Sequence, residues 1–396
     1  MSIVDSQNAQ LYFVDPDIRK AETLPACAFT DKDFLQLELS TIFKDSWLPI
    51  PEPSQQNYAN NAESLVDFMR IRGAHSPFSL FSHPYFLQRD FKGEGKLHCF
   101  PNVCTHAWYP LVLGQGRTRE KRIICAQHGR QFNCDGSFLS QKGFETTLEF
   151  PRACDALRDI PVASWKQFLF VRLGERGRNL ESYLTEMTAS TLHMHVEEWK
   201  RVAQTIDVRE VKGNWKQHAW NYMDTFHIPF IHQAPEGLAD AIDTATYQTE
   251  LYPDSALQWA FAKDPSHGFD PDLLPSRFRD PKDPTKRVFA LWWFVFPNMT
   301  FNFYPWGLSV NVYMPVPDKP DRTNFFWYHY VLDEAKYADR NISWLSQRID
   351  DEDTDAIGKA FRGISSPFAV RSKFAPSAEK GPHWFHRQVF TKIFDR

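Results

Sequence analysis

The pattern of hydrophobic and polar positions predicts an amphipathic helix near the N-terminus. Between residues 21 and 47, apolar residues recur at the spacing of one helix face. The stripe consists of Phe34, Leu35, Leu37, Leu39, Ile42 and Phe43. Thr30 and Asp31 precede it and provide the side chains that cap a helix N-terminus. We therefore expect an N-terminal segment, residues 1–44, that packs on the domain formed by residues 174–396.

From residue 45 to about 173 the pattern changes to short apolar or alternating runs that Pro, Gly and Asn interrupt. Such runs are typical of β-strands joined by turns. The clearest runs cover residues 78–81, 97–103, 122–125 and 168–173. We expect residues 45–173 to form a small all-β domain.

The remainder, residues 174–396, mixes both patterns. The pattern predicts helix over residues 179–199 and a strand over residues 201–212. Residues 235–283 show no clear periodicity, and we expect them to form a long loop beside a substrate channel. A β-meander is expected over residues 289–296, 300–304, 308–314 and 324–331, followed by a long helix over 335–362. An antiparallel sheet with flanking helices is an α+β domain.

Length and composition are those of a globular protein with two domains. With 396 residues, the chain is much longer than the roughly 150 residues typical of one domain. The 34 Phe, 13 Trp and 13 Tyr imply large apolar cores or an aromatic-lined cavity. A net charge of -4 argues against a nucleic-acid surface, which needs a concentrated basic face. No run approaches the roughly 18 apolar residues of a membrane span, and we expect a cytoplasmic protein.

Two mixed Cys/His pairs predict a metal cluster in the all-β domain. Cys104 and His106 form a Cys-x-His pair, and Cys125 and His128 form a Cys-x-x-His pair. Zinc fingers usually group Cys with Cys and His with His. In a Rieske [2Fe-2S] centre, two Cys hold one iron and two His hold the other. The alternative is a structural zinc in a non-catalytic binding protein.

A second candidate site lies between residues 214 and 232. If Asp224 opens a helix that carries His227, carboxylate and imidazole lie on one face. Pro229 can then bend the chain so that His232 returns. Two imidazoles suit Fe, Cu, Zn or Ni, and a distant carboxylate would complete the facial triad of a non-haem Fe(II) oxygenase.

Both motifs together resemble the α-subunits of Rieske non-haem iron oxygenases, which include aromatic-ring-hydroxylating and choline- or carnitine-type enzymes. The cluster motif is Asn102-x-Cys104-x-His106 with Cys125-x-x-His128-Gly129, and Asn214, Asn221, Asp224, His227 and His232 match the iron motif. Three positions depart from the family. Ala107-Trp108 replaces the usual Arg-Gly, Arg130 replaces a usual Trp, and Trp220 stands where Glu is frequent.

The resemblance implies a Rieske domain, a helix-grip catalytic domain and a third iron ligand. Glu352-Asp353 followed by Arg362-Gly363 is similar to the segment that supplies this ligand, which selects Asp353 beside His227 and His232. Asp350 or Asp351 would take its place if the register slips.

The resemblance also implies a homotrimer in which Asp224 bridges a ligand imidazole and His128 of a neighbouring subunit. Such an oxygenase uses O2 and electrons that pass from NAD(P)H through a ferredoxin or flavin reductase. The expected reaction is arene dihydroxylation, or mono-oxygenation or demethylation of an N-methyl or quaternary ammonium compound. Sequence alone leaves both open.

Overall fold

The computed structural model describes residues 6–51, 64–92, 95–118, 120–202, 207–232, 237–339 and 342–395. Its contacts divide the chain into a larger unit, Met1–Phe43 with Glu181–Arg396, and a smaller unit, Lys44–Leu180. Within the described ranges, none of the helices combines the length and apolar character that crossing a bilayer demands.

The N-terminal segment of the larger unit contains the predicted stripe but breaks it into several elements. These are α1 Ser6–Tyr12, α2 Cys27–Thr30, α3 Lys32–Glu38 and a π-helical turn, η1 Leu39–Phe43. Asp31 caps α3, and its Oδ1 accepts a hydrogen bond from Asp33 N at 2.7 Å, as the sequence predicts. Phe34 and Phe43 of the stripe are buried.

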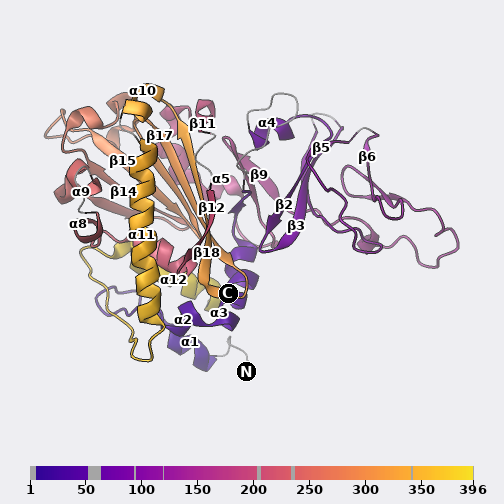
Figure 1. The fold of residues 1–396 in the computed structure, drawn as a ribbon, viewed down its shortest axis with the longest axis horizontal. Coiled ribbons are helices and arrows are strands. Elements are labelled where there is room, and N and C mark those ends of the chain that lie inside the picture. The colour runs from indigo at the N-terminus through magenta and orange to yellow at the C-terminus, as the bar shows by residue number, and fades with distance from the viewer. Residues whose placement is uncertain are drawn as a thin grey trace. The chain divides into compact units, whose positions relative to one another are not determined.

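An eight-stranded antiparallel sheet forms the centre of the larger unit (Figure 1). Its strands are β11 Lys200–Arg201, β12 Asp207–Lys212, β13 Gln248–Leu251, β14 Ser255–Phe261, β15 Val288–Val295, β16 Met299–Tyr304, β17 Gly307–Val316 and β18 Lys319–Val331. The order is β11-β18-β17-β16-β15-β14-β13, and β12 also pairs with β18. The predicted meander is confirmed, and the α+β class with it. Residues 203–206 of the predicted strand 201–212 lie outside the described residues.

The prediction of one long loop over residues 235–283 is wrong. β13 and β14 lie within it and extend the sheet beyond β15. Trp259 faces Leu291 across the β14–β15 ladder, so cross-strand packing stabilises this segment. Three residues, Tyr252 to Asp254, join the two strands, and the Pro253-Asp254 pair in this tight connection conceals the alternation on either side.

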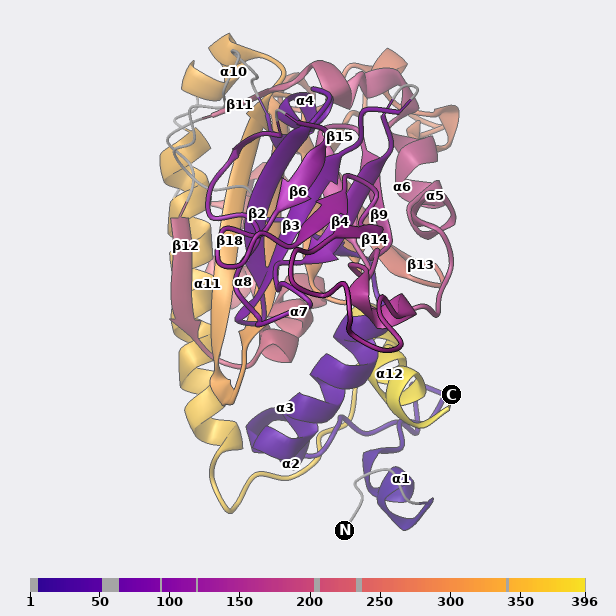
Figure 2. The ribbon, with the colours of Figure 1, turned by 90° about the vertical axis from the view of Figure 1, so that its right-hand side faces the viewer.

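The helices of the larger unit surround this sheet. They are α5 Leu180–Tyr183, α6 Thr185–Ser190, α7 Trp215–Met223, α8 Ile228–Ile231, α9 Leu238–Ala241, α10 Glu334–Asp339, α11 Ile342–Ile364 and α12 Lys380–Phe394. Helix α11 packs against β12, α7 and α8. Figure 2 shows α2, α3 and α12 gathered at one end of the sheet. The predicted helix 335–362 corresponds to α10 and α11, with residues 340–341 outside the described ranges.

Short 3-10 turns complete both units. They cover Ala153–Asp155, Leu192–Met194, Val196–Glu198, Thr244–Thr246, Pro265–His267, Pro271–Leu273 and Ser276–Phe278.

The smaller unit consists mainly of short antiparallel strands, as predicted. Its elements are β1 Leu48–Pro49, α4 Leu65–Met69, β2 Ala74–Leu80, β3 His83–Arg89, β4 Leu97–Pro101, β5 Gly116–Arg117, β6 Arg122–Ile124, β7 Gln131–Asn133, β8 Phe138–Ser140, β9 Val162–Trp165 and β10 Phe168–Val171. They form the sheets β4-β3-β2-β5, β6-β7-β8 and β1-β10-β9. Phe86, Phe100 and Phe132 form a core that includes Cys104 and Cys125. The two cysteines of the candidate cluster therefore lie in a buried apolar core.

Candidate metal centres

Asn214 anchors the segment that carries the candidate iron ligands. It is buried, and its side chain accepts a hydrogen bond from Lys216 N at 3.1 Å. Its Nδ2 donates to the carbonyl oxygens of Phe29 and Pro320, each at 2.9 Å. Asn214 is thus the N-cap of α7 and fixes the start of this helix to two distant parts of the chain.

The prediction that Asp224 opens a helix carrying His227 is wrong. Helix α7 ends directly before Asp224, which is its C-cap and has an extended backbone. Asp224 Oδ1 accepts a hydrogen bond from Phe226 N at 2.7 Å, and a side chain that bonds its own downstream backbone favours a turn. The next helix, α8, begins only after His227. His227 and His232 therefore flank a one-turn helix at its two ends.

Three side chains from distant parts of the sequence converge in the larger unit. The Nε2 atoms of His227 and His232 lie 3.5 Å and 3.2 Å from Asp353 Oδ1. One possible ligand atom from each residue lies within 4.8 Å of the others. Asp353 Oδ1 is buried and has no hydrogen-bond partner among the described residues. Two imidazoles and one such carboxylate form a donor set that fits Fe(II).

A further carboxylate stands behind each of the two imidazoles. Glu352 Oε2 lies 2.8 Å from His232 Nδ1, and Asp224 Oδ2 lies 3.5 Å from His227 Nδ1. A carboxylate at hydrogen-bonding distance, as Glu352 is, fixes the tautomer and the orientation of a metal-binding imidazole, whereas His227 Nδ1 makes no hydrogen bond within the described ranges. The sequence predicts no role for Glu352, because one member of a run of four acids is distinguished only once the helix register is known.

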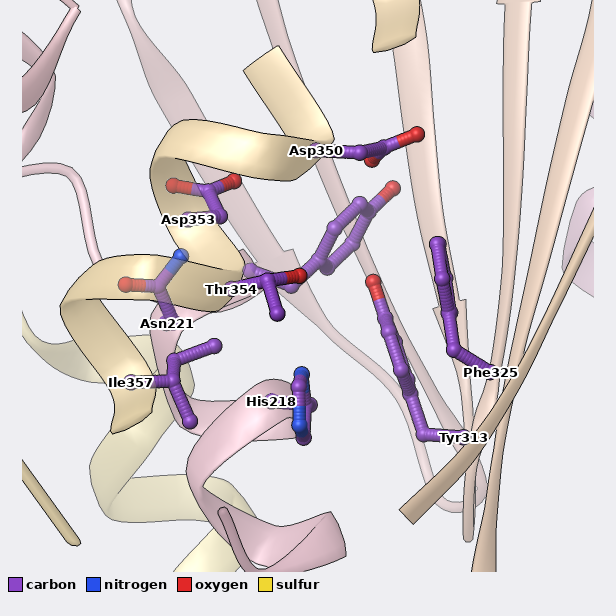
Figure 3. A pocket seen from close by; sticks show the side chains of 9 residues that line it. His218, Asn221, Tyr313, Phe325, Asp350, Asp353, Thr354 and Ile357 are labelled. Carbon is purple, nitrogen blue, oxygen red and sulfur yellow. The ribbon is translucent and has the colours of Figure 1, made fainter. Parts of the chain in front are cut away.

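The register of α11 separates the four consecutive acids at 350–353. Asp351 pairs with Arg209 at 2.8 Å. Asp350 and Asp353, one helical turn apart, line the same small cavity as Tyr313 (Figure 3). Neither Asp350 nor Asp351 belongs to the group of converging donors in the described part of the chain.

Asp350 lies at a small cavity of about 20 Å³ beside Asp353. The lining residues are His218, Asn221, Tyr222, Tyr313, Phe325, Asp350, Asp353, Thr354 and Ile357. Asp350 Oδ2 is buried and makes no hydrogen bond within the described ranges. Burial raises the pKa of Asp350 well above its ordinary value, and the neighbouring charge of Asp353 raises it further. Burial also lowers the pKa of His218 to about 4, so His218 offers no positive charge near neutral pH.

A larger cavity of about 360 Å³ has Asp224 and His227 in its wall. Its other lining residues are mostly apolar and come from α2, α7, α8 and α11. Asn221, the remaining residue of the predicted iron motif, lines both this cavity and the small one. The exposed Ile231 and Ala360 belong to its wall, which places part of the larger cavity at the surface.

The four candidate cluster residues lie on two loops of the smaller unit. Cys104 and Cys125 are buried, and their thiols are within hydrogen-bonding range of each other. The rings of His106 and His128 pack with their centroids 4.8 Å apart, and the His128 side of the pair is exposed. Paired thiols on the buried side and paired imidazoles on the outer side fit the two unlike irons of a Rieske cluster.

Arg130 connects the two cluster loops, a role that the sequence does not reveal. It is 1 % exposed. Its guanidinium donates to Thr105 Oγ1 at 2.8 Å, to Gln141 Oε1 at 2.5 Å and to Asp155 Oδ1 at 3.2 Å. Its centre lies 5.3–5.5 Å from the rings of Phe138, Phe144 and Phe150. The residue that departs from the family motif is therefore a fully satisfied buried cation.

Comparisons with known proteins agree with this arrangement. Residues 196–393 match the model of the ring hydroxylating alpha subunit (catalytic domain), and residues 65–151 match the Rieske [2Fe-2S] domain. The chain is 26 % identical over 377 residues to choline monooxygenase, chloroplastic, of Atriplex hortensis, covering 92 % of this chain and 77 % of the relative. It is 24 % identical over 366 residues to the carnitine monooxygenase oxygenase subunit of Acinetobacter baumannii, covering 90 % and 88 %.

Solved structures share the fold over nearly the whole chain. The quaternary ammonium Rieske monooxygenase CntA has a TM-score of 0.73 at 20 % identity and covers 98 % of this chain and 99 % of its own. Naphthalene 1,2-dioxygenase from Rhodococcus sp. also has a TM-score of 0.73, at 16 % identity, with 99 % of each chain covered. The structural likeness thus includes proteins named for ammonium substrates and proteins named for arenes.

Proposed function

The chain belongs to the family of ring-hydroxylating oxygenase α-subunits, and from this membership we propose which residues and which substrate class serve its reaction. It is a Rieske-type non-haem iron oxygenase that uses a [2Fe-2S] cluster, a mononuclear iron and O2. The zinc-stabilised binding protein, the alternative from the sequence, has no support in this membership.

We assign the metal-binding roles to the residues of the two candidate centres. The iron residues are His227, His232 and Asp353, and the cluster residues are Cys104, His106, Cys125 and His128. Iron in such a triad supplies O2 activation, since the triad leaves coordination positions open. Glu352 and Asp224 orient the two imidazoles, and Asn221 lines the space next to them.

The proposed substrate is a cation, a quaternary or N-methylated ammonium compound. The carboxylate of Asp350 carries this proposal, because its Oδ2 is buried and makes no hydrogen bond within the described ranges, one helical turn from Asp353. Burial favours the neutral form of this acid, and a cationic ligand beside it would favour the charged carboxylate and serve as its partner. No lysine or arginine lines the small cavity in the described part of the chain, and Arg209 acts on Asp350 only from outside it.

Aromatic side chains next to Asp350 suit the same substrate, which would lie beside the small cavity, because about 20 Å³ has room for only about one water. Tyr222 and Tyr313 line the small cavity, and Tyr304, Trp292 and Tyr247 continue the aromatic surface beside Tyr222. Ring faces attract ammonium groups, and aromatic cages are a recurring solution for quaternary ammonium ligands. Choline and carnitine monooxygenases among the relatives are named for substrates of this class.

An arene is the second candidate substrate. Aromatic walls also stack on aromatic ligands, and naphthalene 1,2-dioxygenase shares the fold. A neutral arene leaves Asp350 without a partner, which is why we place the ammonium class first.

An oxygen-uptake screen tests the substrate class. The holoenzyme is supplied with NAD(P)H and a surrogate flavin reductase, with and without a ferredoxin. Choline, carnitine and N-methylated amines are compared with naphthalene and benzoate. We expect substrate-dependent O2 uptake with formation of a hydroxylated or demethylated product only in the ammonium group. Dihydroxylated arene products together with inert ammonium compounds would assign the second candidate instead.

Replacement of Asp350 by Asn tests the anchoring carboxylate. We expect KM for the active ammonium substrate to rise at least about 30-fold, which is roughly 2 kcal/mol and the lower end for a buried charge pair. A neutral isostere, in which carbon replaces the charged nitrogen, should show little change in inhibition constant. Asp351→Asn is the matched control, because Asp351 pairs with Arg209 outside the cavity. Equal weakening of the cation and the neutral isostere by Asp350→Asn contradicts the anchor.

We further propose a homotrimer in which Asp224 joins two subunits. Asp224 stands behind His227, as a bridging acid must, and His128 is exposed on the smaller unit, as its proposed partner must be. A solved structure of CntA is described as giving insight into inter-subunit electron transfer in that protein. Head-to-tail contacts between unlike surfaces close into a ring when the rotation allows, and three copies make a closed catalytic unit.

The remaining proposals concern the electron donor and the cellular site. We propose a ferredoxin or flavin reductase as the donor, by analogy with the family. We also propose a cytoplasmic location, because all six cysteines are unpaired, and reducing compartments keep thiols in this state.

A further inference from the structure

Trp108 combines two unfavourable features beside the candidate cluster. It stands two residues after His106 and is 81 % exposed. Its φ of +60° lies in the left-handed region, which bulky side chains rarely adopt and which glycine adopts freely. Trp108 N donates to Cys104 O at 3.0 Å, so the backbone is held in this conformation by the cluster loop itself. The family usually has glycine at this position, which makes a tryptophan here a feature of this chain.

The larger cavity next to Asp224 is large enough for an indole ring. It measures about 360 Å³, whereas an apolar cavity of about 150 Å³ already accepts a benzene molecule. The apolar residues of its wall are Phe29, Trp220, Ile231, Ala356, Ile357, Ala360 and Ile364. Two of these residues are alanines on α11, which leave the space open, and Trp220 stands where the family often has Glu.

Further exposed apolar side chains lie in the segment that contributes Asp224, His227 and Ile231 to the cavity wall. Phe226 is 49 % exposed and Phe230 is 72 % exposed, and both lie on the short stretch between Asp224 and His232. Large exposed apolar side chains that gather around a cavity mark an interaction site. The exposed rings of Phe226 and Phe230 therefore indicate that the partner surface is apolar and aromatic.

We propose that Trp108 of one copy of this chain inserts into the Asp224 cavity of a second copy. The inference rests on the proposed homotrimer and names the contact that holds it. Trp108 adjoins His106 and the cavity wall contains Asp224 and His227, so one insertion brings the imidazole pair of one subunit to the bridging acid of the next. Tryptophans that fill a pocket are the strongest class of interface hot spot. The exposed side chain of Trp108 is thereby buried in the assembly.

The first test is the assembly of Trp108→Gly holoenzyme in sedimentation equilibrium. Loss of a hot spot is worth at least a factor of about 30 in affinity, so the trimer should dissociate at least about 30-fold more readily. Glycine suits the positive φ, so the thermal midpoint of the isolated subunit should not fall. Leu113→Gly is the matched control, because Leu113 is 72 % exposed and follows in the same loop. Unchanged dissociation of Trp108→Gly overturns the inference.

A second test locates the contact directly. A benzoyl-phenylalanine photo-crosslinker replaces Trp108 in a mixture of ¹⁴N- and ¹⁵N-labelled holoenzyme. We expect crosslinks to peptides of α7 or α11 that join light and heavy chains. Crosslinks only to other segments in a wild-type trimer refute the Trp108 contact and leave the trimer standing. A wild-type enzyme that is monomeric and fully active refutes the proposed assembly itself.

Discussion

Replacement of Asp224 by Asn should lower coupled turnover at least about 100-fold while both metal centres stay loaded. Asn has the same size and keeps the acceptor that holds Phe226 N at 2.7 Å, so the turn after α7 survives. It lacks the negative charge that Asp224 places 3.5 Å from His227 Nδ1, and it carries one acceptor fewer toward a second imidazole. The measurement is product formed per O2 consumed with the surrogate reductase.

The iron content and the visible spectrum of the cluster show whether the lower turnover of Asp224→Asn results from a lost metal centre. Asp224→Asn should match the wild type in both, because Asp224 is not one of the three converging donors. Asp351→Asn is the matched control, since it also removes one acid near the iron but one that pairs with Arg209. Turnover near the wild-type level in Asp224→Asn would exclude the bridging role. Equal losses in both variants would point to a general effect of charge.

Much of the fold follows from the sequence because the local patterns and the packing agree. The capped N-terminal helix and the meander from Val288 to Val331 have clear periodicities, and the structure contains both. The missed strand β14 is stabilised by pairing with β15, which is far from it in the chain, and β13 pairs in turn with β14. Hydrophobic periodicity within one segment does not carry that information.

The residues of the candidate sites also fall into two groups: local spacing identifies some of them, and only the fold reveals the roles of the others. Spacing within a segment identifies His227 and His232 and the two Cys/His pairs. Which acid of the run at 350–353 faces these imidazoles depends on how α11 is rotated against α7 and α8, and only the family motif selects Asp353 beforehand. The roles of Glu352 and Arg130 arise from contacts with distant residues, for which no short motif exists.

Replacement of Arg130 by Met should destabilise the smaller unit by about 3 kcal/mol, the lower end of the range for breaking a buried ion pair. The side chains of Arg130 and Asp155 are 2 % and 4 % exposed, so the carboxylate loses its buried partner and keeps only the more exposed Arg152. Thr105 Oγ1 and Gln141 Oε1 lose a donor at the same time. Thermal unfolding of the cluster-loaded protein, followed by the visible absorbance, measures the loss. Arg158→Met should have almost no effect, because Arg158 and its partner Glu175 are both largely exposed.

The charge, rather than the shape, should account for most of this effect. Burial raises the pKa of Asp155, but hydrogen bonds from Arg152 and Arg130 outweigh it and leave the pKa below its ordinary value of 3.8. A lowered pKa contributes stability above the unfolded pKa, and this contribution is lost as the pH falls through the folded pKa. The advantage of the wild type over Arg130→Met should therefore be full at pH 7 and shrink below about pH 4. Asp155→Asn in the Arg130→Met background should recover part of the stability at pH 7, because it removes the unpaired charge. An Arg130→Met midpoint that equals the Arg158→Met midpoint would mean that the buried pair contributes nothing.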